Sequence, residues 1–130
     1  MNKAKNILVV DDDVDYLGQV SMILEAEGYK VHPAQGQNEA EEVLLTMIPD
    51  LAVIDLMMEN TDSGFVLCHR IKKLFPETPV IMLTGVKAST GLDFTARSKE
   101  ASSWTQADAI IDKPVRPEQL KTEVRRLLSR

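Results

Sequence analysis

The sequence predicts an α/β fold in which helices cover both faces of one parallel β-sheet. Five short apolar runs alternate along the 130 residues with segments whose apolar residues recur at helical spacing. No internal repeat or linker interrupts this alternation, and the length suits one average domain. Strands that alternate with helices form parallel sheets that are buried on both sides, so we expect a single five-stranded domain over residues 1–130.

The first three expected strands lie in the first half of the chain. Residues 6–10 and 51–55 are apolar runs typical of buried strands, and residues 29–33 form a shorter second strand. A helix follows Asp13 and is expected to stop at Gly28. Its predicted core face is Val14, Leu17, Val20 and Leu24.

Two further helices flank the third strand. Asn38 can cap the first of them, and Pro49 ends it. Its predicted core face is Ala40, Val43, Leu44 and Met47. The other helix follows a polar loop at 56–63, and its apolar side is Phe65, Cys68, Ile71 and Phe75.

The second half of the chain contains the last two strands, at 80–84 and 107–112. Between them, residues 85–105 are rich in Ser, Thr and Lys and predict a long loop with one poor helix, with weak order across 86–100. Pro117 suits the first turn of a last helix. Its predicted core face is Leu120, Val124, Leu127 and Leu128.

Composition excludes several classes of protein. No apolar stretch approaches the ~20 residues that a membrane span needs, and the short apolar run after the N-terminus meets acidic residues too soon for a signal peptide. The formal net charge of −5 argues against nucleic-acid binding by this domain alone. Cys68 is the single cysteine, so no internal disulfide can form and a cytoplasmic location is expected.

Polar residues stand where four of the predicted strands end. Asp11 and Asp12 follow the first strand, Asp55 ends the third, Thr84 ends the fourth, and Lys113 follows the fifth. Parallel strands present their carboxyl ends at one edge of the sheet, where ligands bind. Carboxylates from two strands suit a hard divalent cation such as Mg²⁺. A lysine and a hydroxyl could hold two phosphoryl oxygens, leaving one carboxylate as a nucleophile that forms an aspartyl phosphate.

A simpler interpretation exists for the acidic run itself. Acidic residues before a helix often only cap it and interact with its dipole. We interpret Asp13 as such a cap and Asp15 as a solvated residue of the first turn. For Asp11 and Asp12 taken alone, capping and metal binding are equally good interpretations. The coincidence with Asp55, Thr84 and Lys113 at other strand ends favours metal binding.

The sequence resembles the response-regulator receiver domains of two-component signalling. The resemblance covers the whole chain and rests on four motifs in order: ILVVDDD, PDLAVIDLMM, PVIMLTG and DKP. It implies a flavodoxin-like doubly wound sheet with strand order 2-1-3-4-5. It also implies transfer of a phosphoryl group from a histidine kinase's phosphohistidine to an aspartate, here Asp55.

The resemblance also implies a role for each site residue. Asp12 would bind Mg²⁺ directly, Asp11 partly through water, and Asp55 and the backbone carbonyl of Met57 would complete the protein ligands. Thr84 and Lys113 would each contact a phosphoryl oxygen, and the Lys113–Pro114 bond would be cis. The six residues with implied roles at the site are Asp11, Asp12, Asp55, Met57, Thr84 and Lys113.

Three features depart from the family pattern. Glu59 stands where a proline is usual, and the loop before Gly64 carries one extra residue; we interpret Glu59 as a solvated loop acid. Ile110 replaces the usual aromatic residue, so a switch based on an aromatic side chain is not expected. The segment between Thr84 and Lys113 is longer than is usual, which alters a region that normally takes part in output.

We therefore expect a phosphorylation-controlled switch whose only catalysis is its own phosphorylation and dephosphorylation, not turnover of a separate substrate. Its partners would be a sensor histidine kinase or phosphotransfer protein and an output partner that the sequence does not identify. Homodimer formation and continuation of the native chain beyond Arg130 stay open. The alternatives are a Mg²⁺-dependent phosphohydrolase with an aspartate nucleophile and a scaffold that acts without phosphorylation.

Overall fold

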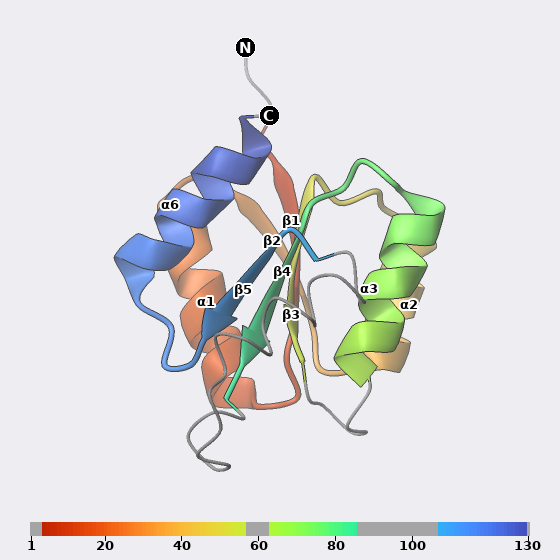
Figure 1. The fold of residues 1–130 in the computed structure, drawn as a ribbon, viewed down its shortest axis with the longest axis horizontal. Helices are drawn as coiled ribbons and strands as arrows, with labels where there is room; N and C mark the ends of the chain where they lie inside the picture. Colours follow the sequence, from red (N-terminus) through yellow and green to blue (C-terminus); the bar gives the residue numbers. More distant parts are fainter. Residues whose placement is uncertain (1–3, 57–62, 86–106, 130) are drawn as a thin grey trace.

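A computed structural model describes residues 4–56, 63–85 and 107–129. Five strands form one parallel sheet in the order β2-β1-β3-β4-β5, as predicted (Figure 1). The strands are β1 (Asn6–Val10), β2 (Lys30–Ala34), β3 (Leu51–Asp55), β4 (Val80–Thr84) and β5 (Ala109–Asp112). β1, β3 and β4 have the predicted bounds, β2 starts and ends one residue later, and β5 starts two residues later.

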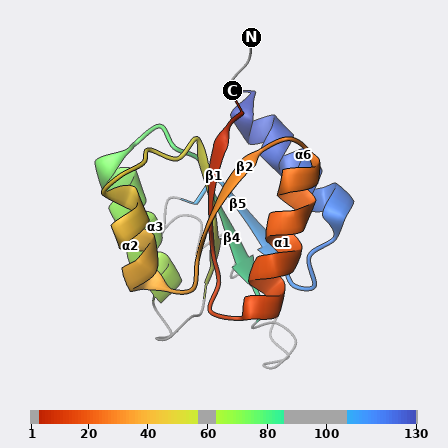
Figure 2. The same cartoon turned by 180° about the vertical axis from the view of Figure 1, so that it is seen from behind.

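Helices cover both faces of the sheet and make a three-layer arrangement. α1 and α6 lie on one face and α2 and α3 on the other, as the two opposite views show (Figures 1 and 2). The four helices within the described ranges are α1 (Val14–Ala26), α2 (Gln37–Leu44), α3 (Ser63–Leu74) and α6 (Pro117–Leu128). Because all neighbouring strands pair in parallel, their carboxyl ends lie at one edge of the sheet.

The hydrophobic core consists of two clusters, one on each face of the sheet. Along β1, Ile7 and Val9 belong to the cluster under α1 and α6, whereas Leu8 and Val10 belong to the cluster under α2 and α3. All four side chains are almost fully buried. Both faces of the strand are therefore apolar, which explains why the sequence shows a continuous apolar run instead of alternation.

The predicted ends of α1 and α6 agree with the structure. Asp13 is the N-cap of α1, and its side chain accepts hydrogen bonds from the backbone N–H groups of Asp15 and Tyr16 at 3.0 and 3.4 Å. Gly28, with φ of 91°, follows the end of α1 in a conformation that favours glycine. Pro117 begins α6, where its missing N–H removes no helical hydrogen bond.

Some local predictions were wrong. Asn38 does not cap α2, because the helix begins at Gln37 and its N-cap is Gly36, which has no side chain to offer. The same helix ends at Leu44, well before Pro49. Val14 is 60% exposed, since it lies in the first turn of α1, which projects beyond the core.

The predicted core faces are otherwise close to the observed ones. On α3, Cys68 and Ile71 are buried, but Leu67 is buried in place of the two phenylalanines, which pack against the cluster while half-exposed. The other predicted residues that are buried are Leu17, Val20, Leu24, Ala40, Leu44, Leu120, Val124 and Leu127. Those that are half-buried are Val43, Met47 and Leu128.

An ion pair fixes β5 beside β4 at the amino edge of the sheet. One carboxylate oxygen of Asp108 accepts hydrogen bonds from Lys72 Nζ on α3 and from the backbone N–H of Val80, each at 2.8 Å. Lys72 Nζ also donates to the carbonyl of Thr78 at 2.8 Å. These contacts hold the start of β5 against α3 and β4, in the register that places Lys113 at the opposite edge.

Several predictions fall outside the described residues. These are the polar loop with Met57 and Glu59, and the long loop with its poor helix and its weak order across 86–100. Within the residues that the structure describes, none of the helices has the length and hydropathy needed to cross a membrane.

Candidate functional site

Three carboxylates gather at the carboxyl edge of the sheet. Asp11 and Asp12 follow β1, and Asp55 ends the neighbouring strand β3, in a register that pairs Val10 with Ile54. One oxygen of each carboxylate lies within 4.8 Å of the others. Asp11 and Asp55 are 2% and 5% exposed, whereas Asp12 faces solvent. The edge therefore offers one open and two buried carboxylates.

Asp11 is engaged through both of its carboxylate oxygens. Oδ1 accepts a hydrogen bond from the backbone N–H of Asp13 at 2.9 Å, and Oδ2 accepts one from Lys113 Nζ at 3.0 Å. The first of these bonds links the carboxylate to the start of α1. Asp11 is thus held in a fixed orientation, and the solvent-facing Asp12 is more accessible to an incoming cation.

Lys113 follows β5, the outer strand of the sheet, and its side chain reaches back to the carboxylates of Asp11 and Asp55. Its backbone N–H donates to the carbonyl of Thr84 at 2.7 Å, which continues the β4–β5 ladder past Asp112. Its Nζ atom lies 3.4 Å from Asp55 Oδ1, and its side chain is 15% exposed. The Lys113–Pro114 peptide bond is cis, as the resemblance implied.

Burial and the charges at this edge shift the pKa values of Asp55 and Lys113. Burial, followed by the nearby negative charge of Asp11, raises the pKa of Asp55 to about 7, although Lys113 opposes the shift. Burial lowers the pKa of Lys113, but its hydrogen bond to Asp11 and the charges of Asp55 and Asp11 together raise it above the usual value. Lys113 is therefore charged at neutral pH, whereas burial and Asp11 disfavour the charged form of Asp55.

Thr84 ends β4 beside the carboxylates. Asp55 pairs in register with Leu83, so Thr84 stands one position further along the neighbouring strand, and it is 1% exposed. On β5, Ile110 pairs with Met82 and is half-buried against the cluster on the α2 and α3 face. An aliphatic side chain thus fills the position that is usually aromatic.

Gly64 brings the start of α3 against the end of β3, the strand that carries Asp55. Its backbone N–H donates to the carbonyl of Leu56 at 3.1 Å. A Cβ atom on Gly64 would stand 2.5 Å from that carbonyl oxygen and 2.6 Å from the carbonyl oxygen of Asp55. Only glycine permits this approach, which braces the backbone that carries Asp55.

The donor set fits a hard divalent cation. Three carboxylates that can each offer one oxygen to a common point, one of them open to solvent, suit a metal that keeps several waters, which is the usual behaviour of Mg²⁺. Two buried carboxylates beside a single lysine also leave excess negative charge at the edge. A divalent cation would neutralise that excess.

The structure brings together five of the six site residues predicted from the sequence: Asp11, Asp12, Asp55, Thr84 and Lys113. The sixth, Met57, lies outside the described residues. Sequence reasoning missed the close approach of Gly64 and the contact of Tyr16 with Lys113. For Tyr16, the sequence offered one signal: the residue lies in the first helical turn after the acidic run, and that turn starts at the carboxyl edge of the sheet.

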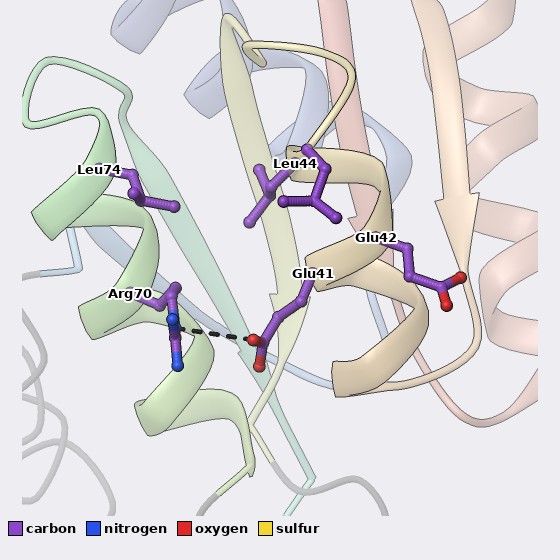
Figure 3. Close-up of a pocket in the computed structure, with 6 residues that line it drawn as sticks. Glu41, Glu42, Leu44, Arg70 and Leu74 are labelled. Atoms are coloured by element: carbon purple, nitrogen blue, oxygen red, sulfur yellow. Dashed lines mark ion pairs between the residues drawn. The ribbon is translucent and has the colours of Figure 1, made fainter.

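A pocket on another part of the surface holds none of these residues. It lies between α2 and α3, where Arg70 Nε stands 3.6 Å from Glu41 Oε1 (Figure 3). The residues that line it are Glu41, Glu42, Leu44, Leu45, Arg70 and Leu74. The candidate site is thus the open acidic edge and not this groove.

A doubly wound sheet with a buried acidic pair, a lysine and a threonine at its carboxyl edge defines a CheY-like signalling domain. A family model for the response regulator receiver domain matches residues 7–125, and the chain belongs to this family, that of two-component regulators. The acidic edge agrees with the Mg²⁺ and aspartyl phosphorylation of such domains.

Known proteins of this family are similar along nearly the whole chain. The phosphate regulon transcriptional regulatory protein PhoB of Pseudomonas aeruginosa is 33% identical over 128 residues, which are 97% of this chain and 52% of PhoB. The heme response regulator HssR of Staphylococcus saprophyticus is 33% identical over 123 residues, 95% of this chain and 51% of HssR. The chain thus spans about half the length of these relatives.

Solved structures show the same fold. A CheY-like receiver domain protein from Methanospirillum hungatei is 33% identical with a TM-score of 0.80, over 98% of this chain and 95% of that one. A response regulator structure from Chloroflexus aurantiacus is 30% identical with a TM-score of 0.84, over 98% of this chain and all of that one.

Proposed function

We propose that this receiver domain is a phospho-acceptor switch in which Asp55 takes a phosphoryl group from the phosphohistidine of a histidine kinase or phosphotransfer protein. The observation that carries the proposal is the position of Asp55, which shares a carboxylate cluster with Asp11 and Asp12 and lies 3.4 Å from Lys113 Nζ. An acceptor carboxylate, cations to neutralise charge and an open edge are the parts that phosphoryl transfer to aspartate needs.

The proposed reaction exchanges one bond to phosphorus for another. A carboxylate oxygen of Asp55 attacks the phosphorus atom, the bond from phosphorus to the donor's imidazole nitrogen breaks, and that nitrogen keeps the electron pair. The products are an acyl phosphate on Asp55 and a dephosphorylated histidine. Water attacking the same phosphorus would later release inorganic phosphate and restore Asp55.

The residues at the edge would lower the barrier by positioning and by charge. Lys113 stays charged and stands beside Asp55, so its ammonium would pair with one phosphoryl oxygen. The hydroxyl of Thr84 would donate to another. Asp11, Asp12, Asp55 and the backbone carbonyl of Met57 would hold Mg²⁺, which supplies positive charge that offsets repulsion between the dianionic group and the carboxylates.

Phosphorylation would bias a two-state equilibrium. It adds charge at the sheet edge and draws Thr84 and Lys113 toward the modified Asp55, which would change the conformation around β4 and the segment after it. An output partner would recognise that change, and Ile110 implies that no aromatic side chain takes part at its position. We propose a cytoplasmic location, in keeping with the lone free cysteine, Cys68.

Phosphorylation with radiolabelled donors tests this function. The protein is incubated with Mg²⁺ and either acetyl phosphate or a phosphohistidine protein, and the label per chain is counted. We expect up to about one phosphoryl group per chain, lost in Asp55→Asn and retained in the control Asp15→Asn, whose acid is exposed in the first turn of α1.

The other outcomes identify the alternatives. Many turnovers on a small phosphoester, dependent on Asp55, would instead support the phosphohydrolase. A folded protein that no donor labels would support a scaffold that works without phosphorylation.

A further inference from the structure

The aromatic ring of Tyr16 lies against the side chain of Lys113. The distance from Lys113 Nζ to the ring centroid is 4.2 Å, within the range of a cation–π contact. Tyr16 belongs to the first turn of α1 and is half-buried, and Lys113 follows β5 near the other end of the chain. The proposed function gives Tyr16 no role.

Within the residues that the structure describes, the ring is the third group that contacts the ammonium of Lys113. Asp11 Oδ2 lies 3.0 Å from Nζ and Asp55 Oδ1 lies 3.4 Å from it. The lysine side chain is only 15% exposed, so water has little access to the ammonium. A cation–π contact strengthens when its cation is desolvated, and the site meets that condition.

The three contacts differ in what a metal does to them. Asp11 and Asp55 belong to the carboxylate cluster that fits a divalent cation, so a cation bound there competes with Lys113 for their oxygens. The face of a neutral phenol ring is not a ligand for a hard cation. The contact with Tyr16 is therefore the one of the three that metal binding leaves in place.

We propose that Tyr16 is a positioning residue for phosphoryl transfer, whose ring holds the ammonium of Lys113 beside Asp55 when a metal takes up the carboxylates. The inference rests on the proposed function of the site. A lysine has a flexible four-carbon stem and gives a single-point contact, so it needs such a restraint more than an arginine fork would.

The start of α1 ties the ring to the acidic edge. The backbone N–H of Tyr16 lies within the cap that Asp13 makes, at 3.4 Å from Asp13 Oδ1. The backbone N–H of Asp13 in turn donates to Asp11 Oδ1 at 2.9 Å. The ring of Tyr16, the cap residue Asp13 and the carboxylate of Asp11 thus all lie within residues 11–16, next to the site.

A matched pair of variants distinguishes the effect of the aromatic ring from the effect of the space that the side chain fills. Tyr16→Phe keeps the ring, and Tyr16→Leu fills similar space without one. At saturating Mg²⁺ we expect the rate of labelling by acetyl phosphate to fall on the order of three- to thirtyfold in Tyr16→Leu and to change less than about twofold in Tyr16→Phe. Both variants should bind Mg²⁺ as tightly as the wild type. The contact between the ring and Lys113 is present with and without metal, so losing it affects the two states equally.

Nuclear magnetic resonance gives a readout that does not depend on phosphorylation. The ε-CH₂ protons of Lys113 lie near the ring face and should resonate upfield of those of Lys72, which pairs with Asp108 at the other edge. We expect this upfield shift to persist at saturating Mg²⁺, to remain in Tyr16→Phe and to vanish in Tyr16→Leu. Loss of the shift when Mg²⁺ is added to the wild type would overturn the inference.

The labelling results distinguish failure of the inference from failure of the function. If the wild type is labelled and Tyr16→Leu is labelled equally fast, the function stands and the positioning role is wrong. If both variants lose the same activity, the ring face is not what matters and the inference also fails. If no donor labels the folded wild type, the function and the positioning role fall together, whatever the resonance shows.

Discussion

Lys113 Nζ lies closer to Asp11, at 3.0 Å, than to Asp55, at 3.4 Å. The lysine therefore neutralises a carboxylate of the cluster that fits a divalent cation. A divalent cation that binds there must compete with this ammonium, and it repels the ammonium through their like charges. Metal binding would thereby release the lysine from Asp11 for a phosphoryl group on Asp55.

Replacing the lysine by Lys113→Met should increase the affinity for Mg²⁺ by about tenfold or more, because a unit charge a few ångströms away is worth several kcal/mol in a partly buried site. Titration calorimetry measures the effect. Lys121→Met is the control, since Lys121 lies on α6 and pairs with the exposed Glu118 at 3.5 Å. Weaker binding of Mg²⁺ to Lys113→Met would show that the lysine and the metal do not compete.

Asp55 should make the stability of the metal-free protein depend on pH. Its pKa is raised from 3.8 to about 7, so between these values the folded protein keeps a proton that the unfolded chain has lost. The stability that this group contributes is complete below about pH 4, declines as the pH rises and is gone above about pH 7. Asp55→Asn should remove this decline and stabilise the protein by a few kcal/mol at about pH 8.

Urea unfolding across this pH range, without and with Mg²⁺, measures the effect. Mg²⁺ should stabilise the wild type more than Asp55→Asn, since the cation relieves the repulsion that the substitution also removes. A wild type that gains stability between about pH 4 and pH 7 relative to Asp55→Asn would contradict the raised pKa of Asp55.

Two glycines provide a test of the brace behind the acceptor. Gly64→Ala places a Cβ atom 2.5 Å from the carbonyl oxygen of Leu56, which is backbone and cannot move aside cheaply. We expect a loss of several kcal/mol of stability and slower labelling of Asp55. Gly18→Ala is the control, because nothing lies within 4 Å of its added Cβ in α1, and it should stabilise the protein by about 0.5–1 kcal/mol. If thermal unfolding shows that Gly64→Ala is as stable as Gly18→Ala, the close contact of Gly64 does not support the backbone that carries Asp55.

Asp12 and Asp13 are adjacent, but their substitution should affect different properties, Mg²⁺ binding for Asp12 and stability for Asp13. Asp12 faces solvent within the carboxylate cluster, so Asp12→Ala should abolish measurable Mg²⁺ binding while changing stability little. Asp13 accepts the cap bond from Asp15 N–H at 3.0 Å, so Asp13→Ala should lose ~1 kcal/mol of stability and keep labelling nearly intact. Equal loss of Mg²⁺ binding in both variants would contradict this division.

The sequence by itself determined the sheet and the approximate place of the site. Apolar runs buried on both faces identify parallel strands, and the ends of parallel strands meet at one edge whatever the details of packing. Asp11, Asp55, Thr84 and Lys113 therefore converge as a consequence of topology. The cap at Asp13 was equally readable, because a cap depends only on residues within one turn.

Predictions from local sequence failed at the ends of helices, where neighbouring residues suit a cap or a core position about equally well. Asn38 is a good cap by residue type, yet the N-cap of α2 is Gly36, so the helix begins at Gln37, two residues earlier than a cap at Asn38 would place its start. Val14 continues the apolar period of α1, but it is the first residue of the helix and is exposed. Periodicity gives the face of a helix and not the point at which the core ends.

Only the tertiary structure decided the contacts among residues far apart in the chain. The ring of Tyr16 meets Lys113, the backbone of Gly64 meets the carbonyl of Asp55, and Asp108 joins Lys72. Each contact depends on helix rotation and strand register to within about an ångström, which side-chain packing sets. The sequence thus determined which groups share the edge, and packing determined which atoms touch and so how the lysine and a metal share the carboxylates.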